Sequence, residues 1–201
     1  MIMNKKSIIL ASASPRRQEI LRSLNIEFTT VVTDVNETVT DCVTPQEFVR
    51  IVAERKGRAA RKIITNDELQ MMNCGILIIS ADTIVVIDNK ILGKPRDKQD
   101  AFGMLSLLQG RTHRVYTGIY LIDISDGECK EFFNTECSDV TFKPLNEKEI
   151  RQYVESGEPM DKAGAYGIQG LGGNFVVSYT GELNNIIGLP TDWLIKKVKA
   201  L

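Results

Sequence analysis

The sequence has few of the residues on which many enzymes and metal proteins depend. It contains a single histidine, His113, which excludes a histidine pair or a multi-histidine zinc site within one chain. No two of its four cysteines are spaced as C-x-x-C, which disfavours a structural zinc site and a dithiol redox pair. Scattered thiols are typical of a reducing compartment, so we expect a cytoplasmic protein. The cysteines are Cys42, Cys74, Cys129 and Cys137.

The sequence also lacks a basic excess and long apolar runs. Its 201 residues include 25 Lys and Arg against 26 Asp and Glu, which argues against nucleic-acid binding but permits a local basic pocket. The strongest apolar runs, 76–79 and 84–87, are far too short to span a bilayer, and the polar N-terminus is unlike a signal peptide. We therefore expect neither a nucleic-acid nor a membrane partner, and a soluble protein of one domain or two small lobes.

Strands and helices alternate along the chain, and this order predicts an α/β fold with a pair of antiparallel strands in the middle of the chain. Hydrophobic runs and turn signals predict strands over 7–11, 28–32, 75–81, 90–92, 112–123, 128–142 and 174–179, with Asp82 bounding the strand 75–81 and an extended segment over 83–87. Helical spacing and capping residues predict helices from Pro15, from Pro45 to about residue 65, over 98–108, over 146–156 and from Pro190.

The segment 12–17, Ser-Ala-Ser-Pro-Arg-Arg, lies between a predicted strand and a predicted helix. Ser14 is a good N-cap, and Pro15 suits the first helical position. The backbone N–H groups of such a loop and the helix dipole favour an anion, and the guanidinium groups of Arg16 and Arg17 suit phosphate oxygens. The same residues are equally compatible with a helix cap followed by two solvated arginines.

Asp82 directly follows the most apolar run of the chain, 75–81. Ligands bind at the carboxyl ends of buried strands in open α/β sheets. A carboxylate buried there needs a partner charge, hydrogen bonds or a metal. We therefore expect Asp82 to be functional; the alternative is that it only caps a turn with Thr83.

Other candidates are ambiguous from the residues alone. Glu37, Lys56 and Lys94 could each be an ordinary solvated charge, and His113 is expected to be a hydrogen-bonded structural histidine rather than a base. The glycine-dense segment 163–173 matches neither a Walker A loop nor G-x-G-x-x-G, and it could approach a ligand closely or form a flexible loop. Together, acids, cations, hydroxyls and glycine-rich backbone suit phosphate chemistry with a divalent cation.

Five segments, in order, resemble the signature of the Maf family of nucleoside triphosphate pyrophosphatases. They are SASPRR at 12–17, ADT at 81–83, GKP at 93–95, GRTH at 110–113 with Val115 and Thr117, and KAGAYGIQG at 162–170. The resemblance extends over essentially the whole chain, from residue 8 to the segment 188–190. The five segments in this order indicate the family far more specifically than any one segment alone.

The resemblance implies that residues 1–201 form a single Maf-like domain. Its fold would be that of Maf and ITPase-like proteins, an elongated mixed β-sheet flanked by helices, with two lobes around a central cleft. The boundary between the lobes is not placed by the sequence. The implied reaction is hydrolysis of a nucleoside triphosphate to the monophosphate and pyrophosphate with Mg²⁺ or Mn²⁺, by a homodimer.

The same resemblance assigns roles to individual residues. Asp82 corresponds to the proton acceptor, and Glu37 and Asp82 are the expected metal ligands. The expected phosphate-binding residues are Ser12, Arg16, Arg17, Lys56 and Lys94.

Three positions indicate the substrate. Arg16, Thr83 and Gln169 follow the pattern of family members that prefer dTTP and UTP, with modified pyrimidine nucleotides as further expected substrates. A sister group acting on 7-methyl-GTP carries an aromatic residue, Gln and Glu at these positions. An aromatic face suits a cationic purine, and a carboxylate accepts from guanine N–H groups. The Gln169 amide instead both donates and accepts, as a pyrimidine edge requires.

Two positions depart from the family pattern. Asn36-Glu37 stands where an Asp-Glu pair is common, which leaves one acid and could change metal affinity. Gly57 follows Lys56 where Ala is usual, and we expect a slightly looser helix with unchanged chemistry. Two alternative functions stay open: a pyrophosphatase for 7-methyl-GTP or another modified nucleotide, and a non-catalytic nucleotide-binding regulator of cell division.

Overall fold

The computed structural model describes residues 6–40, 43–64, 75–125 and 127–201. The chain divides into two compact units. Unit 1 contains residues 1–82, 118–135 and 188–201, and unit 2 contains residues 83–117 and 136–187. Cys42 and Cys74 lie outside the described residues, whereas Cys129 and Cys137 are exposed free thiols.

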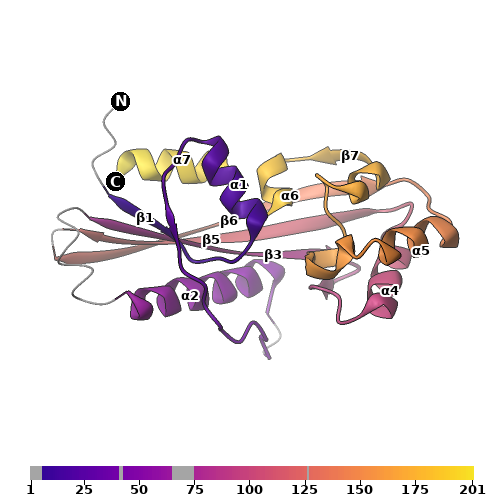
Figure 1. The fold of residues 1–201 in the computed structure, drawn as a ribbon, viewed down its shortest axis with the longest axis horizontal. Helices are drawn as coiled ribbons and strands as arrows, with labels where there is room; N and C mark the ends of the chain where they lie inside the picture. Colours follow the sequence, from indigo (N-terminus) through magenta and orange to yellow (C-terminus); the bar gives the residue numbers. More distant parts are fainter. Residues whose placement is uncertain (1–5, 41–42, 65–74, 126) are drawn as a thin grey trace. The chain divides into compact units, whose positions relative to one another are not determined.

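All seven described strands belong to one sheet (Figure 1). They are β1 (Ser7–Leu10), β2 (Thr29–Thr30), β3 (Ile76–Ile87), β4 (Lys90–Leu92), β5 (Thr112–Ser125), β6 (Glu128–Phe142) and β7 (Val176–Thr180). Their order is β2-β1-β3-β5-β6-β7, and β4 pairs with β3. Strand β1 is parallel to β2 and β3, whereas β4 and β7 are antiparallel to β3 and β6. The predicted mixed α/β fold is therefore confirmed.

Six α-helices are described, namely α1 (Pro15–Ser23), α2 (Pro45–Ile63), α4 (Lys98–Leu108), α5 (Glu147–Glu155), α6 (Leu183–Ile187) and α7 (Thr191–Ala200). The sequence predicted all of them except the short α6. The strand predicted over 28–32 shortens to Thr29–Thr30, both exposed. The segment 163–173 contains one 3₁₀ turn, Ala163–Ala165, and the start of a second, Leu171–Phe175, rather than an unstructured loop.

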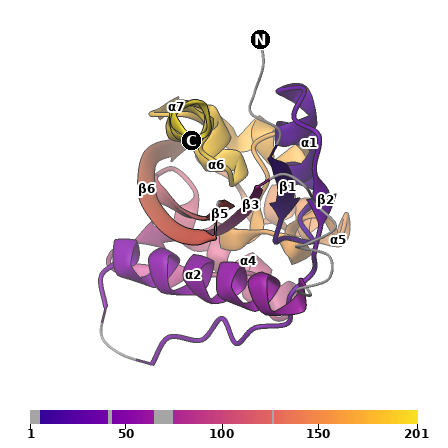
Figure 2. The same cartoon turned by 90° about the vertical axis from the view of Figure 1, so that its left-hand side faces the viewer.

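In unit 1, α2 lies against one face of the sheet, and α1 and α7 lie against the other (Figure 2). Helix α2 begins with the predicted capping box, in which Thr44 Oγ1 accepts from the N–H of Glu47 and the Glu47 carboxylate accepts from the N–H of Thr44. Its buried face joins residues of the sheet in one apolar cluster. Members of this cluster are Ile9, Ala53, Ala60, Ile78, Tyr120 and Ile122. This packing fixes the distance of α2 from the sheet and its rotation about its own axis.

Gly57 is at a close approach between α2 and β3. A Cβ atom at this position would lie 2.8 Å from Ser80 Oγ and 3.1 Å from a ring carbon of Tyr120. The Ser80 hydroxyl cannot turn away freely, because it is buried and donates to the carbonyl of Ala53 at 2.7 Å. Glycine therefore lets α2 approach the sheet closely, one residue after Lys56.

In unit 2, helices α4 and α5 pack against each other, and a second apolar cluster combines residues of both helices with strand residues. His113 is buried beside this cluster, with its ring edge-on to Phe142 and Tyr166 at centroid distances of 4.9 and 5.3 Å. Its Nε2 is 2.8 Å from the hydroxyl of Tyr166. The expectation of a hydrogen-bonded structural histidine is confirmed. Gly157 ends α5 in the left-handed region, at φ 77°.

Candidate active site

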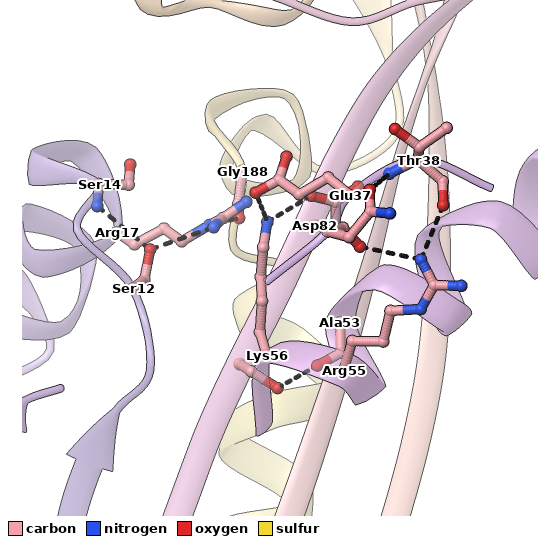
Figure 3. Close-up of polar contacts among 12 residues, drawn as sticks. Ser12, Ser14, Arg17, Glu37, Thr38, Ala53, Arg55, Lys56, Asp82 and Gly188 are labelled. Atoms are coloured by element: carbon pink, nitrogen blue, oxygen red, sulfur yellow. Dashed lines mark hydrogen bonds and ion pairs between the residues drawn. The ribbon is translucent and has the colours of Figure 1, made fainter. Parts of the chain in front are cut away.

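The loop between β1 and α1 is organised around Ser12 and Arg17. Ser12 Oγ accepts from the backbone N–H of Ser14 and from Nη1 of Arg17, both at 3.2 Å (Figure 3). Arg17 Nε donates to the carbonyl oxygen of Gly188 at 2.8 Å. Ser14 occupies the N-cap position as predicted, but its side chain makes no capping hydrogen bond. The hydroxyl that orders this loop is therefore that of Ser12.

Arg17 is buried, with 8% of its surface exposed. Burial lowers the pKa of its guanidinium, and the negative charge of Asp82 acts in the opposite direction. The guanidinium still stays protonated at neutral pH. The alternative of two solvated arginines is thus excluded for Arg17, whereas Arg16 is half-buried.

Asp82 lies within β3 and not at its end, because β3 continues to Ile87. The prediction of an acid at a strand tip is wrong in this respect. Its neighbour β1 does end nearby: Leu10 of β1 pairs with Ile79, and the N–H of Ala11 donates to the carbonyl of Ile79 at 2.8 Å. The acid therefore lies just beyond the carboxyl end of a parallel strand, which is where ligand sites form in such sheets.

Lys56 joins the two candidate acids (Figure 3). Its Nζ lies 2.7 Å from Asp82 Oδ1 and 2.8 Å from Glu37 Oε1. The side chains of Lys56 and Asp82 are 12% and 9% exposed, whereas that of Glu37 is 49% exposed. A carboxylate as buried as Asp82 requires such a counter-charge. The structure thus brings together Glu37, Lys56 and Asp82, which are far apart in the sequence.

Arg55 holds the segment that carries Glu37, a role that sequence reasoning missed. Its Nη1 donates to the carbonyl of Asn36 at 2.9 Å and to the carbonyl of Thr38 at 2.8 Å (Figure 3). The guanidinium therefore bridges the residues on either side of Glu37. Neighbouring positions on α2 supply both the side chain that fixes this backbone and the lysine that contacts its carboxylate.

The donor set of this cluster fits a divalent cation that also binds phosphate. Glu37 and Asp82 each direct one carboxylate oxygen to the same nitrogen, so the two carboxylates lie close together and supply the oxygen ligands that a hard cation takes. Among the described residues, no three His, Cys, Asp or Glu side chains are grouped to hold a metal. Mg²⁺ is commonly bound by one or two carboxylates together with substrate phosphates and waters, which this pair would allow.

The remaining predicted site residues belong to unit 2. The hydroxyl of Thr83 is 3.0 Å from that of Thr117, which in turn donates to the carbonyl of Asn185 at 2.9 Å. Lys94 and Gln169 are exposed. The roles expected for these residues stay predictions.

The fold and the carboxylate–lysine cluster define an α/β protein with a site suited to a metal-bound phosphate ligand. The chain belongs to the Maf family, because the family model described as "Maf-like protein" matches residues 7–201. The predicted membership is confirmed over nearly the whole chain. In addition, no helix among the described residues is both long and apolar enough to cross a bilayer.

Curated relatives resemble the chain along most of their length. A protein of Clostridium botulinum is 45% identical over 93% of this chain and 95% of its own, and one of Desulforamulus reducens is 44% identical over 92% and 91%. One of Desulfitobacterium hafniense is 42% identical over 96% and 84%. All three are named dTTP/UTP pyrophosphatase. Among solved structures, a HAM1 protein of Coxiella burnetii aligns over 98% of both chains at 15% identity, with a TM-score of 0.37.

Proposed function

We propose that the chain hydrolyses dTTP and UTP to the nucleoside monophosphate and pyrophosphate. The observation that carries this proposal is the convergence of Asp82 and Glu37 on Lys56. The names of the relatives and the residues Arg16, Thr83 and Gln169, which match the pyrimidine-specific pattern, support the choice of substrate. Modified pyrimidine nucleotides belong to the same proposal.

The charges of the cluster support a requirement for a divalent metal. Lys56 and Arg17 balance the charges of Asp82 and Glu37, so the carboxylate–lysine cluster and Arg17 together have no net charge. The negative charge of a triphosphate must therefore be met by additional cations. Arg16 and Lys94 are the proposed protein contributors, and Mg²⁺ or Mn²⁺ held by Glu37 and Asp82 would polarise the phosphoryl group and lower the pKa of a water.

Asp82 is the proposed proton acceptor. A water attacks the α- or the β-phosphorus, its proton passes to the Asp82 carboxylate, and the bond between the α and β phosphates breaks to give the nucleoside monophosphate and pyrophosphate. Lys56 holds this carboxylate in place and stabilises its negative charge before the reaction. Ser12 and Arg17 order the loop that donates to the phosphates, and burial of Arg17 keeps its guanidinium at a fixed position.

A nucleotide panel in Mg²⁺ or Mn²⁺ tests the proposal, with pyrophosphate and orthophosphate quantified separately. We expect pyrophosphate from dTTP and UTP, with no orthophosphate. In ¹⁸O-labelled water, label in the monophosphate shows attack at the α-phosphorus, whereas label in pyrophosphate shows attack at the β-phosphorus. A strong preference for 7-methyl-GTP would overturn the substrate assignment, and tight nucleotide binding without turnover would favour a regulator.

The setting of this activity is also part of the proposal. The family resemblance supports a homodimer that works in the cytoplasm, and the exposed thiols of Cys129 and Cys137 are compatible with a reducing compartment. The near-neutral charge supports a small-molecule substrate and no nucleic-acid partner. Light scattering on the purified protein tests the homodimer, and fractionation of its native cells tests the cytoplasmic location.

A further inference from the structure

Gln169 lies in a tight turn of unit 2. The N–H of Gly170 donates to the carbonyl of Gly167 at 3.3 Å, so Ile168 and Gln169 are the two central residues of this turn. Ile168 packs against the apolar cluster of unit 2, whereas Gln169 is exposed. The side chain before Gln169 therefore anchors the turn, and Gln169 itself is presented to solvent.

Glu158 holds the backbone that follows this turn. Its Oε2 accepts from the N–H of Leu171 at 2.9 Å, and its Oε1 accepts from the N–H of Gly172 at 3.2 Å. The hydroxyl of Tyr153 donates to Glu158 Oε1 at 2.9 Å and accepts from the N–H of Gly167 at 3.3 Å. Glu158 and Tyr153 therefore bind backbone N–H groups on both sides of Gln169.

Charge and space both favour this arrangement. Burial acts to raise the pKa of Glu158, but the hydrogen bonds from Leu171, Gly172 and Tyr153 and the charge of Lys162 together outweigh it and lower the pKa, which keeps the carboxylate ionised. A Cβ atom at Gly170 would overlap the Glu158 carboxylate, and one at Gly172 would lie 2.6 Å from the Tyr153 hydroxyl. The two glycines thus permit a close approach of the backbone to these side chains.

We propose that Glu158, with Tyr153, is a positioning residue that fixes the Gln169 turn for recognition of the pyrimidine base. The inference rests on the proposed function, in which Gln169 reads the base. An amide distinguishes thymine from cytosine only if its donor and its acceptor are held in a defined orientation. Both carboxylate oxygens of Glu158 accept hydrogen bonds from backbone N–H groups. In Glu158→Gln an NH₂ group replaces one of these oxygens, so a side-chain donor faces a backbone donor and that hydrogen bond is lost.

The test compares dTTP with dCTP, whose bases differ in the donor and acceptor pattern of the same edge. The variants are Glu158→Gln and Tyr153→Phe, which keep the size of the side chain, and the control is Glu155→Gln at an exposed glutamate near the end of α5. We expect the ratio of kcat/KM for dTTP to that for dCTP to fall about tenfold in both variants, mainly through KM for dTTP. The control should keep the wild-type ratio.

The outcomes separate this inference from the proposed function. If wild type prefers dTTP and both variants keep that preference, or lose activity equally on the two nucleotides, the inference is overturned. If Glu158→Gln does not fold, the ratio measured for Tyr153→Phe decides alone. A wild-type protein that releases no pyrophosphate, or does not prefer dTTP, overturns the proposed function and this inference together.

Discussion

The ammonium group of Lys56 lies 2.7 Å from Asp82 Oδ1, and both side chains are largely buried. A buried ion pair that loses one partner leaves an uncompensated charge. Replacing Lys56 with Met should therefore lower the free energy of unfolding by about 3 kcal/mol, as measured by urea denaturation. The variant should also have greatly reduced pyrophosphatase activity.

The matched control is Lys98→Met. Lys98 pairs with Glu155 at 2.6 Å, but both side chains are more than half exposed, so its loss should cost less than about 1 kcal/mol. The double variant Lys56→Met/Asp82→Asn should recover part of the stability lost in Lys56→Met. Equal effects of Lys56→Met and Lys98→Met would contradict the role of the buried pair.

Arg55 should affect metal binding through the position of Glu37. Replacing Arg55 with Ala releases the carbonyls of Asn36 and Thr38, and the Glu37 carboxylate then loses its fixed place. Loss of a residue that orients a metal ligand typically weakens metal affinity by about 10- to 100-fold. A Mg²⁺ titration of activity should show a shift of at least about tenfold in the half-saturating concentration.

The control for this prediction is Arg61→Ala, at an exposed position on the same helix. It removes the same charge from α2 without touching the segment 36–38. A similar Mg²⁺ shift in both variants would mean that Arg55 acts only through the net charge of α2.

Gly57→Ala should destabilise the protein although alanine is the better helix former. The substitution gains up to about 1 kcal/mol in helix propensity. The added methyl group meets the Ser80 hydroxyl at 2.8 Å, and overpacking of this kind costs roughly 1–3 kcal/mol. We expect a net loss of about 1 kcal/mol by urea denaturation, and a smaller loss or a gain in the Ser80→Ala background. Stabilisation by Gly57→Ala in both backgrounds would show that the close approach is unimportant.

His113 should make the stability depend on pH below neutrality. Burial lowers the pKa of its imidazole from 6.5 to about 4, and within the described residues its Nδ1 has no hydrogen-bond partner. As pH falls from 6.5 to 4, the unfolded chain takes up a proton that the folded protein does not. The stabilisation is therefore complete above pH 6.5 and is lost through this window, by about 3 kcal/mol.

The variant His113→Gln isolates this contribution, because the chain has no other histidine. Its free energy of unfolding between pH 7 and 4 should fall by about 3 kcal/mol less than that of wild type. Parallel pH profiles for the two proteins would mean that His113 is not kept neutral by burial.

Most of the helices and strands could be predicted from hydrophobic spacing and caps, as at Thr44 and Glu47. Other features depend on which segments meet in space. The continuation of β3 past Asp82 reflects its pairing with β4, and the strand predicted over 28–32 shortens where pairing with β1 ends.

The candidate site was predicted in its residue types but not in its contacts. Glu37 and Lys56 each looked like solvated charges, and only the packing of α2 brings them to Asp82. Arg55 and Glu158 bind backbone groups. Every residue has such groups, so the amino-acid sequence does not show which of them a side chain will bind. Glu158 also stands outside the motif segment 162–170, so nothing in the sequence connected it with Gln169.

The most direct test of the account is the rate of pyrophosphate release from dTTP in Mg²⁺ by wild type and Asp82→Asn. Loss of the proposed proton acceptor should reduce kcat by at least about 100-fold, because asparagine cannot take a proton from water. The control Asp139→Asn, at a half-exposed aspartate of unit 2, should keep the wild-type rate. A wild-type rate in Asp82→Asn would contradict the central role of this carboxylate.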